Sequence, residues 1–419
     1  MSNFKKDLAV IGLGYVGLPL VVESSNCDLK VVGYDNNPEI VKKLRKGFSH
    51  IEDITDDMLK KALDKELTIV DSPDCLKDCE HIVISVPTPL TDYQPDLSYV
   101  KAAAKTIAEN ITKNQVIILE STTYPGTTIE VLIPEIESIS QLKSGKDFYV
   151  GYSPERIDPG NKTWNFKNTP KVVSGIDKES TKKIKKFYTK IIDEVVLVSG
   201  TKEAEMVKLL ENTYRHVNIA FINELAILCN MLDIDIWEVV EAAKTKPFGF
   251  ESFRPGPGVG GHCIPIDPNY LSFKTREIGK PVRFVELAQE INNTMPSYIV
   301  GRILEKMNSL EKPMNNSNIL ILGVAYKKDI SDTRESPSID IIGNLHSKGV
   351  NVSYYDPFVE NLDINTPIKR ELDVKNFNKY DLILFHTAHS QFSKINFQEI
   401  DVPIFDATGT DYLSNSERI

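Results

Sequence analysis

Short apolar runs separated by glycine-containing polar turns recur along the chain, and this pattern predicts an α/β fold. The first run, Leu8–Ile11, leads through a glycine-rich turn into an apolar helical stretch that begins at Leu18. Further apolar runs follow at Val31–Tyr34, His81–Val86 and Gln115–Leu119. Parallel strands that are buried on both faces have this continuous apolar character. We therefore expect a doubly wound, Rossmann-like sheet in the first part of the chain.

The middle of the chain is predicted to be helical from about Thr201, which we expect to be the N-cap. Apolar side chains recur there at helical spacing and predict a buried stripe. The stripe consists of Met206, Leu209, Leu210, Val217, Phe221 and Leu225. A second helical tract runs through Trp237 to Ala243, and a third runs from about Val282 to Met307.

The last part of the chain repeats the strand pattern of the first part. Three apolar runs follow in the same order as at the beginning, at Asn318–Gly323, Val350–Asp356 and Asp381–His386. Where the first part has two further glycines, this repeat has Val324–Lys328. Lys327, Lys328 and the nearby Arg334 favour contact with a phosphate through side chains. We expect a second Rossmann-like domain that binds a nucleotide or another phosphate.

Composition and charge narrow the class of protein. A length of 419 residues fits several domains, which we place at 1–198, 199–312 and 313–419, the middle one helical. The net charge of −10 argues against a nucleic-acid partner. Five cysteines without metal-like pairing indicate a reducing cytoplasm and no metal site, and Cys75 and Cys79 are read as structural. No apolar stretch reaches about twenty residues, so no membrane span is expected.

The glycines of the first turn have the spacing of a dinucleotide-binding motif. Gly12, Gly14 and Gly17 form GxGxxG between a predicted strand and helix, and Asp35 ends the next strand. The glycines allow a tight turn, close approach to a pyrophosphate and close packing of helix on strand. Asp35 would accept hydrogen bonds from the adenosine ribose, which favours NAD over NADP.

Polar residues follow several predicted strands, where a doubly wound sheet binds its ligands. Thr88 and Thr122 lie in two such loops, although capping of the next helix is an equally ordinary role for a threonine. Glu155 and Arg156 follow another strand and, taken alone, read as a solvated turn.

A loop rich in glycine and proline, Pro255–Pro268, carries a single thiol, Cys263, with Asp267 four residues later. In an isolated loop of this kind the cysteine is more often structural than reactive. Lys208 and Asn212 share one face of the preceding long helix. Together with a cofactor domain before it and a phosphate-binding domain after it, this setting makes Cys263 a candidate nucleophile of a dehydrogenase.

Seven segments in order have the sequences GLGYVGLP, SVPTP, STTYPGTT, SPERIDPG, EAEMVKLLENTYR, PGPGVGGHCIPIDP and KKDISDTRESPS. They begin at Gly12, Ser85, Ser121, Ser153, Glu203, Pro255 and Lys327. With these motifs the chain resembles the UDP-glucose/GDP-mannose dehydrogenase family. The last three motifs also resemble the subgroup that acts on UDP-N-acetylhexosamines. Pro159 and His262 depart from the UDP-glucose branch, which has Glu and often Ser there, and Ala407–Gly409 follow Asp406 where that branch has a substrate-binding arginine.

The resemblance implies an NAD-dependent, four-electron oxidation of the C6 alcohol of a UDP-sugar to a carboxylate, for polysaccharide precursor synthesis. UDP-N-acetylglucosamine is the expected substrate, with UDP-N-acetylmannosamine and UDP-glucose as alternatives. The family also implies a homodimer that pairs through the helical region. Two other readings stay open: a two-electron hydroxyacid dehydrogenase, and a regulator that binds NAD or a nucleotide sugar without turnover.

The resemblance also implies roles for individual residues. Cys263 would form a thiohemiacetal and then a thioester, Lys208 would stabilise the oxyanion, and Asp267 and Thr122 would hold the waters. The implied catalytic set is Cys263, Lys208, Asp267, Asn212, Glu155 and Thr122. The cofactor set is Gly12, Gly14, Tyr15, Val16, Gly17, Asp35, Thr88 and Thr122. The substrate set is Arg156, Ile157, Lys208, Asn212, Arg215, Arg254, Gly261, Tyr326, Lys327 and Arg334.

Overall fold

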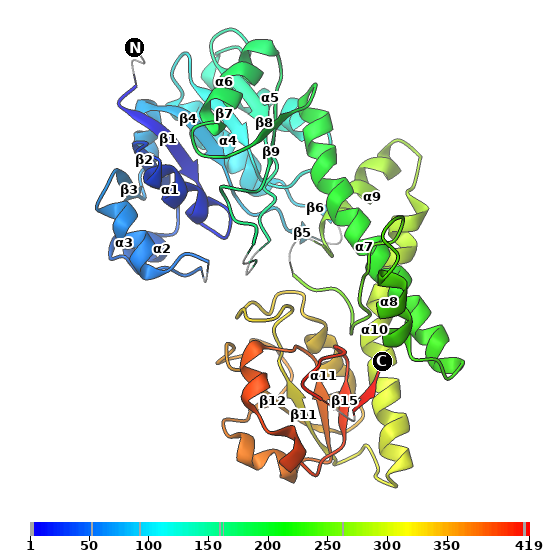
Figure 1. Ribbon diagram of the computed structural model, residues 1–419. Coiled ribbons are helices and arrows are strands. Elements are labelled where there is room, and N and C mark those ends of the chain that lie inside the picture. The colour runs from blue at the N-terminus through cyan, green and yellow to red at the C-terminus, as the bar shows by residue number, and fades with distance from the viewer. Residues whose placement is uncertain are drawn as a thin grey trace. The chain divides into compact units, whose positions relative to one another are not determined.

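The computed structural model describes residues 4–51, 53–91, 94–158, 161, 163–261, 264–413 and 416–419. The chain divides into two compact units. The first comprises Met1–Glu211 and Asn269–Lys280, and the second comprises Asn212–Pro268 and Pro281–Ile419. Each unit is built around its own β-sheet, which is mainly parallel in the first unit and parallel in the second (Figure 1).

The sheet of the first unit has eight strands in the order β10-β9-β8-β7-β4-β1-β2-β3. Its strands are β1 (Lys6–Ile11), β2 (Val31–Tyr34), β3 (Leu67–Val70), β4 (Cys79–Ile84), β7 (Val116–Leu119), β8 (Tyr149–Tyr152), β9 (Lys171–Gly175) and β10 (Val195–Leu197). All neighbours are parallel except β8 and β9, which are antiparallel. A two-stranded hairpin, β5 (Leu90–Thr91) and β6 (Gln94–Pro95), follows β4.

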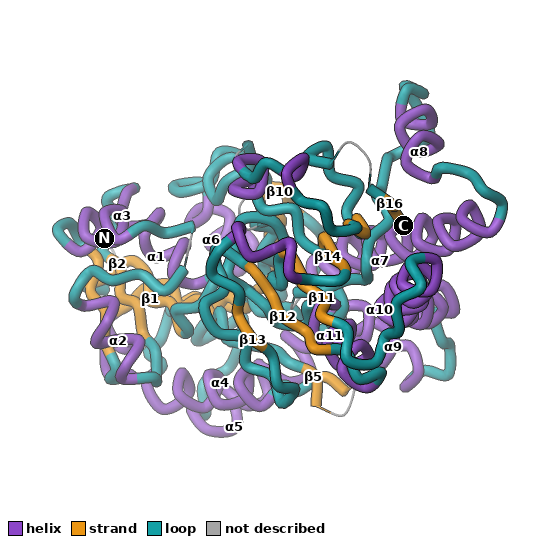
Figure 2. The backbone as a smooth tube through the Cα atoms, turned by 90° about the horizontal axis from the view of Figure 1, so that it is seen from below, coloured by secondary structure: helices purple, strands orange, loops and turns teal. Residues whose placement is uncertain are grey.

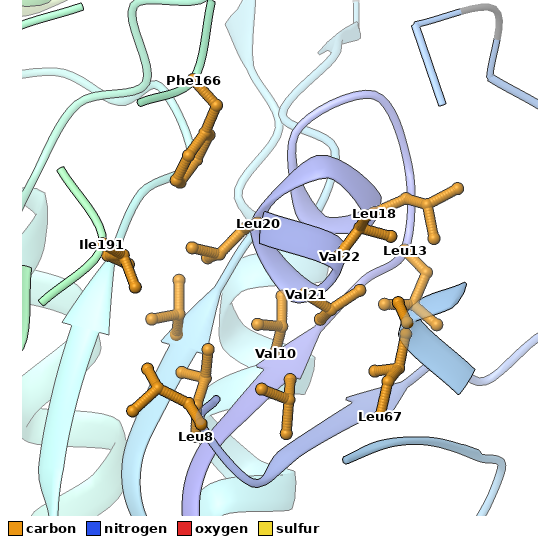
Figure 3. Close-up of a cluster of buried hydrophobic side chains, with 14 of the residues drawn as sticks. Leu8, Val10, Leu13, Leu18, Leu20, Val21, Val22, Leu67, Phe166 and Ile191 are labelled. Carbon is orange, nitrogen blue, oxygen red and sulfur yellow. The ribbon is translucent and has the colours of Figure 1, made fainter. Parts of the chain in front are cut away.

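The helices of the first unit are α1 (Gly17–Asn26), α2 (Pro38–Arg45), α3 (Asp56–Leu63), α4 (Ser98–Asn110), α5 (Ile133–Ser140) and α6 (Lys178–Tyr188). Helix α1 packs directly on the sheet. Figure 3 shows Leu20 and Val21 of this helix lying against Leu8 and Val10 of β1, and all four side chains are fully buried. Burial of aliphatic side chains of this size stabilises the fold by about 1.5–3 kcal/mol each. The position of α1 on the strands is therefore fixed by its apolar face.

Four helices make up the central region: α7 (Thr201–Met231), α8 (Ile236–Lys244), α9 (Asp267–Glu277) and α10 (Arg283–Ser309). The boundary between the two units falls within α7 and within α9. The predicted N-cap is wrong. Ala204 N donates to Gly200 O at 3.2 Å, so Gly200 caps α7, and the buried Thr201 hydroxyl has no partner among the described residues.

The predicted buried stripe of α7 is also partly wrong. Met206, Leu210 and Phe221 are 37%, 59% and 54% exposed, whereas the positions that are buried include Ala204, Leu209, Ala220, Ile222 and Ala226. Helical spacing identifies an apolar face, but it does not tell what covers that face. Part of the apolar face of α7 is therefore exposed among the residues that the structure describes.

The sheet of the second unit has six parallel strands in the order β13-β12-β11-β14-β15-β16. They are β11 (Asn318–Leu322), β12 (Asn351–Tyr355), β13 (Lys369–Arg370), β14 (Leu382–Phe385), β15 (Ile404–Asp406) and β16 (Glu417–Arg418). Helix α11 (Pro337–Ser347) connects β11 to β12. Figure 2 shows β13, β12, β11 and β14 side by side. Two Rossmann-like sheets and a helical region confirm the predicted fold class.

The two sheets repeat the same turn in detail. Gly12 N donates to Tyr34 O at 2.9 Å, and Gly323 N donates to Tyr355 O at 2.9 Å. Both glycines have positive φ, +91° and +76°. A Cβ atom at Gly12 would collide with the carbonyl oxygen of Ser85, and one at Gly323 would collide with that of Thr387. The internal repeat seen in the sequence therefore reflects the same backbone geometry in both units.

Replacing Gly323 by Ala is expected to lower stability by about 1–3 kcal/mol, because an L-residue is strained at this φ and its Cβ has no room. Gly343→Ala is the matched control in the same unit. Gly343 lies inside α11, where an added Cβ would meet no atom within 4 Å, so alanine should raise stability by about 0.5–1 kcal/mol. Thermal unfolding midpoints of both variants and the parent chain test this. Equal midpoints for the two variants would contradict it.

Candidate active site

The glycine turn between β1 and α1 has the geometry that a dinucleotide requires. A Cβ atom at Gly17 would collide with Gly12 O, so this glycine permits close packing of helix on strand. At Gly14, in contrast, a Cβ would meet nothing within 4 Å, and this space faces no protein atom. No side chain caps α1 at Val16. The open space and the uncapped helix amides fit a pyrophosphate.

Asp35 holds the backbone of this turn and still has acceptor positions for a ligand. Its Oδ2 accepts a hydrogen bond from Leu13 N at 2.9 Å, and its Oδ1 accepts one from Asn37 N at 2.9 Å. The residue is half-buried, and a carboxylate offers about four acceptor positions. Two positions therefore remain for ribose hydroxyls. Tyr15 and Val16 are also half-buried beside the turn. The residues of the first unit thus fit NAD, as the sequence predicts.

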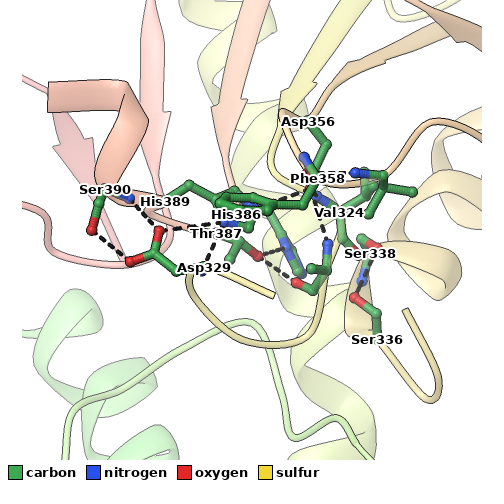
Figure 4. Close-up of polar contacts among 12 residues, drawn as sticks. Val324, Asp329, Ser336, Ser338, Asp356, Phe358, His386, Thr387, His389 and Ser390 are labelled. Atoms are coloured by element: carbon green, nitrogen blue, oxygen red, sulfur yellow. Dashed lines mark hydrogen bonds and ion pairs between the residues drawn. The ribbon is translucent and has the colours of Figure 1, made fainter. Parts of the chain in front are cut away.

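The corresponding carboxylate of the second unit is used differently (Figure 4). Asp356 is buried and accepts from four backbone amides, those of Val324, Ala325, Phe358 and Val359. His389 also contacts it, with Nε2 3.1 Å from Oδ2. Its acceptor positions are occupied, so this carboxylate holds the turn together and is not available to a ribose.

The loop after β7 is fixed from two sides. The Ser121 hydroxyl accepts from Val86 N at 2.9 Å and donates to Val86 O at 2.8 Å, which ties this loop to the one after β4. Thr88 and Thr122, one in each loop, are half-buried. The two threonines predicted from the sequence therefore belong to neighbouring, connected loops at the carboxyl edge of the sheet.

Glu205 of α7 holds the other end of this loop, which the sequence analysis missed. Its carboxylate accepts from Gly126 N at 2.5 Å, from Thr128 N at 2.8 Å and from the Thr128 hydroxyl at 2.7 Å. The side chain is fully buried, and this burial raises the pKa of Glu205. An acidic residue in a first helical turn predicts a charge–dipole contact, and nothing in its spacing indicates a partner in another loop.

Lys208, one turn along α7, is 9% exposed. Within the described part of the chain its ammonium makes no hydrogen bond or ion pair. A buried charge is costly unless it is paired, so an uncompensated ammonium is a site that an anion would stabilise. This is the electrostatic arrangement that a developing oxyanion requires.

Asn212 and Asp267 lie together in the second unit. The Asn212 amide donates to Asp267 Oδ2, and Asp267 is only 2% exposed at the first residue of α9. The structure thus brings together two of the predicted catalytic residues that are 55 positions apart in the sequence. Cys263 and His262 lie outside the described residues.

The segment before Cys263 is packed tightly within the second unit. Gly256 N donates to Asn223 Oδ1 at 2.9 Å, and Gly261 N donates to Arg334 O at 3.0 Å. A Cβ at Gly261 would lie 2.8 Å from the ring of Tyr326. The glycines of this loop therefore allow its backbone to pass close to Tyr326, one of the predicted substrate residues.

The turn after β8 holds Glu155 and Arg156 in a network rather than in solvent, so the reading of a solvated turn is wrong. Glu155 is 8% exposed and pairs with Lys171 Nζ at 2.7 Å. Arg156 pairs with Glu211 of α7 at 2.6 Å and donates to Pro170 O at 2.7 Å. The polar composition of the turn suggested exposure, but the partners come from β9 and α7, which sequence spacing does not reveal.

The remaining predicted substrate residues lie in the second unit. Arg334 forms a two-pronged pair with Asp332, with Nη2 2.6 Å from Oδ2, and its side chain is half exposed. Lys327 and Tyr326 are half-buried. Arg215 is exposed, and Arg254 pairs with Glu241 at 3.2 Å.

Comparison with known proteins decides the family. Three family models cover most of the chain: the NAD binding domain of the UDP-glucose/GDP-mannose dehydrogenase family at residues 6–192, its central domain at 202–294 and its UDP binding domain at 320–410. The chain belongs to this family. It is therefore an NAD-dependent nucleotide-sugar dehydrogenase, and the predicted cofactor and enzyme class are confirmed.

Curated and solved relatives match over nearly the full length. Protein CapL of Staphylococcus aureus is 36% identical, and the alignment covers 99% of this chain and 99% of CapL. A UDP-N-acetyl-D-glucosamine 6-dehydrogenase of Pseudomonas aeruginosa is 36% identical over 94% of both chains. The structure of a UDP-D-ManNAc dehydrogenase from Pyrococcus horikoshii superposes with a TM-score of 0.89 at 32% identity, covering 98% of this chain and 97% of that one.

The described residues include neither a membrane-spanning helix nor a cluster of metal ligands. None of their helices combines the length and apolar character needed to cross a bilayer. No three of their His, Cys, Asp or Glu side chains gather in a way that would hold a metal ion.

If Lys208 stabilises the oxyanion, as the resemblance implies, Lys208→Met is expected to reduce kcat by about 10²–10³-fold, because a preorganised cation is lost. The thermal midpoint should not fall, since the change removes an uncompensated buried charge. Lys202→Met is the matched control on the same helix, because Lys202 is exposed and pairs with Glu130 at 3.2 Å. Steady-state kinetics and thermal unfolding of both variants test this. A Lys208 variant that keeps its turnover would contradict the assignment.

Proposed function

We propose that this dehydrogenase oxidises the C6 alcohol of UDP-N-acetylglucosamine to the carboxylate in a four-electron reaction. The supporting observation is the buried Lys208 ammonium, which has no ion pair or hydrogen bond among the described residues and lies one helical turn before Asn212, the partner of Asp267. Curated relatives of similar identity act on UDP-N-acetyl-D-glucosamine or on UDP-N-acetyl-D-mannosamine, as their names state. The loop and C-terminal motifs of the sequence resemble the UDP-N-acetylhexosamine subgroup as a whole, and within it the proposal selects the first of these sugars.

The chemistry assigns a task to each residue. NAD, when bound, supplies the hydride acceptor. C6 of the alcohol loses a hydride to it, and the hydroxyl proton passes to water held by Asp267 and Thr122, which leaves the C6 aldehyde. Cys263 adds as thiolate to the C6 aldehyde, forming a C–S bond while the carbonyl becomes an oxyanion beside Lys208. Loss of a second hydride leaves a thioester. Water held by Asp267 and Thr122 then adds, the C–S bond breaks, and the acid leaves while the thiolate is regenerated.

The other predicted residues have binding roles in this proposal. Arg156, Ile157 and Asn212 contact the sugar, and Arg215 lies on the same helix as Asn212. Tyr326, Lys327 and Arg334 hold the uridine diphosphate, for which Arg334 would exchange its Asp332 partner for a phosphate. Gly261 lets the loop backbone approach the substrate. Each of these assignments depends on the substrate being a UDP-sugar.

Stoichiometry tests the reaction class. Purified enzyme with NAD and UDP-N-acetylglucosamine should form two NADH per sugar, and kcat/KM should be highest for this sugar among its mannose and galactose epimers and UDP-glucose. Cys263→Ser should abolish uronate formation and leave NAD binding unchanged. One NADH per sugar would favour a two-electron dehydrogenase, and NAD binding without turnover of any sugar would favour a regulator.

We also propose a homodimer that pairs through the helices of the second unit. A groove of about 510 Å³ lies there between α7, α8 and the segment 249–253, and it is lined mainly by apolar side chains such as Phe221, Val239 and Phe253. Phe221 and Val239 are 54% and 46% exposed. Exposed apolar surface of this kind is typical of an interface. Arg254 lies beside this groove and would reach the partner's substrate.

Phe221→Lys is expected to shift the enzyme from dimer to monomer, because a charge replaces an apolar contact at the centre of the interface. Light scattering coupled to size exclusion measures the mass directly. Lys246→Glu, at an exposed position outside the groove lining, is the control and should stay dimeric. A parent chain that is monomeric at micromolar concentration would exclude the proposal.

A further inference from the structure

A buried group of charges lies at the carboxyl edge of the first sheet. Its member Glu155 belongs to the implied catalytic set, whereas Lys171 and Glu120 have no role in the reaction proposed above. Lys171, the first residue of β9, has its ammonium 2.7 Å from Glu155 Oε2 and 3.1 Å from Glu120 Oε1. The side chains of Lys171, Glu120 and Glu155 are 4%, 0% and 10% exposed. Tyr188 of α6 donates its hydroxyl to Glu120 Oε1. These groups come from β7, the turn after β8, β9 and α6.

The two carboxylates are not equivalent. Both oxygens of Glu155 are occupied, because Oε1 accepts from Arg156 N at 2.7 Å and from Ile157 N at 2.8 Å while Oε2 accepts from Lys171. Oε2 of Glu120, in contrast, is buried without a partner among the described residues. Burying an oxygen without a hydrogen-bond partner costs less free energy when its carboxyl group is neutral than when it is ionised. Glu155 is therefore the better site for the negative charge.

Charge balance leads to the same assignment. With both carboxylates ionised, the group would carry one uncompensated negative charge inside the protein, which is strongly unfavourable. Burial raises the pKa of Glu120. Burial also acts on Glu155, but the nearby Lys171 ammonium outweighs it and lowers the pKa of that carboxyl. The proton of the group thus resides on Glu120, and Lys171 and Glu155 form the ion pair.

The strand start also holds the neighbouring arginine. Pro170 O accepts from Arg156 Nη1 at 2.7 Å, one residue before Lys171. Pro170 thus binds the side chain of Arg156 directly. Lys171 acts on the backbone of Arg156 indirectly, because it holds Glu155, which accepts a hydrogen bond from Arg156 N. We propose that Lys171 is a positioning residue of the dehydrogenase, which acts through the ionised Glu155 to hold the Arg156–Ile157 segment for the UDP-sugar, while Glu120 stays neutral. This inference rests on the proposed function of that segment.

A set of near-isosteric variants tests the proposal. Lys171→Met and Glu155→Gln should each raise KM for the UDP-sugar about tenfold and leave KM for NAD within about twofold. The double variant should match the single variants, because Lys171 acts through Glu155 and the losses are not additive. Glu120→Gln, which replaces one neutral group by another, should keep both KM values within about twofold. Multiplied losses in the double variant, or an unchanged KM for the sugar in Lys171→Met, would overturn the proposal.

A second measurement keeps the test decisive where Lys171→Met fails to fold or where the parent enzyme turns over no UDP-sugar. Glu120 has a pKa near 4.5 when unfolded and a higher one when folded, so its contribution to stability is complete below pH 4.5 and is lost as pH rises through the folded value. In either single variant one carboxylate remains to balance Lys171, so this decline should disappear from both. The variants should differ in the midpoint itself at neutral pH, which Glu155→Gln should lower because it removes the ionised partner and Glu120→Gln should not. The reverse result would place the proton on Glu155 and overturn the proposal. Absence of NADH in the parent enzyme alone contradicts only the proposed function.

Discussion

A carboxylate at the end of the second strand of each sheet holds the backbone amide that follows the glycine after the first strand. Asp35 binds Leu13 N in the first unit, and Asp356 binds Val324 N in the second. The glycine can be no other residue, because its φ is positive and the backbone that follows a neighbouring strand lies against its α-carbon. This contact joins the ends of β1 and β2 in the first unit and of β11 and β12 in the second.

The two carboxylates make the same backbone contact but differ in how many of their acceptor positions are occupied. For this reason the two turns suit different ligands. Asp35 keeps acceptor positions open beside an uncapped helix and an open space at Gly14, which suits a dinucleotide. Asp356 is saturated by amides and His389, so its carboxylate holds the turn of the second unit, and we propose that side chains such as Lys327 and Arg334 recognise the ligand there. The same backbone turn therefore occurs in the NAD binding domain and in the UDP binding domain of this family.

Helix α7 arranges the chemistry along its length. Within two turns Glu205 fixes the loop after β7, Lys208 presents an uncompensated cation, and Glu211 holds Arg156. Asn212 follows and binds Asp267 in the second unit. A regular helix sets the spacing of these side chains, whereas loops alone would leave each of them to move independently.

The sequence by itself determined the elements that depend on local pattern: both sheets, the glycine turn, the acid at Asp35 and the motifs that indicate the family. Apolar runs and glycine spacing are short-range signals, so a linear reading captures them. It could not determine which face of α7 is covered, nor that Gly200 and not Thr201 caps it. Only the tertiary structure showed that Glu205, Glu211 and Lys171 bind groups in distant loops. The sequence does not reveal whether a charged side chain will be buried against another element. The Glu155-Arg156 turn was read as solvated for the same reason, and its burial against β9 gives these two residues their partners.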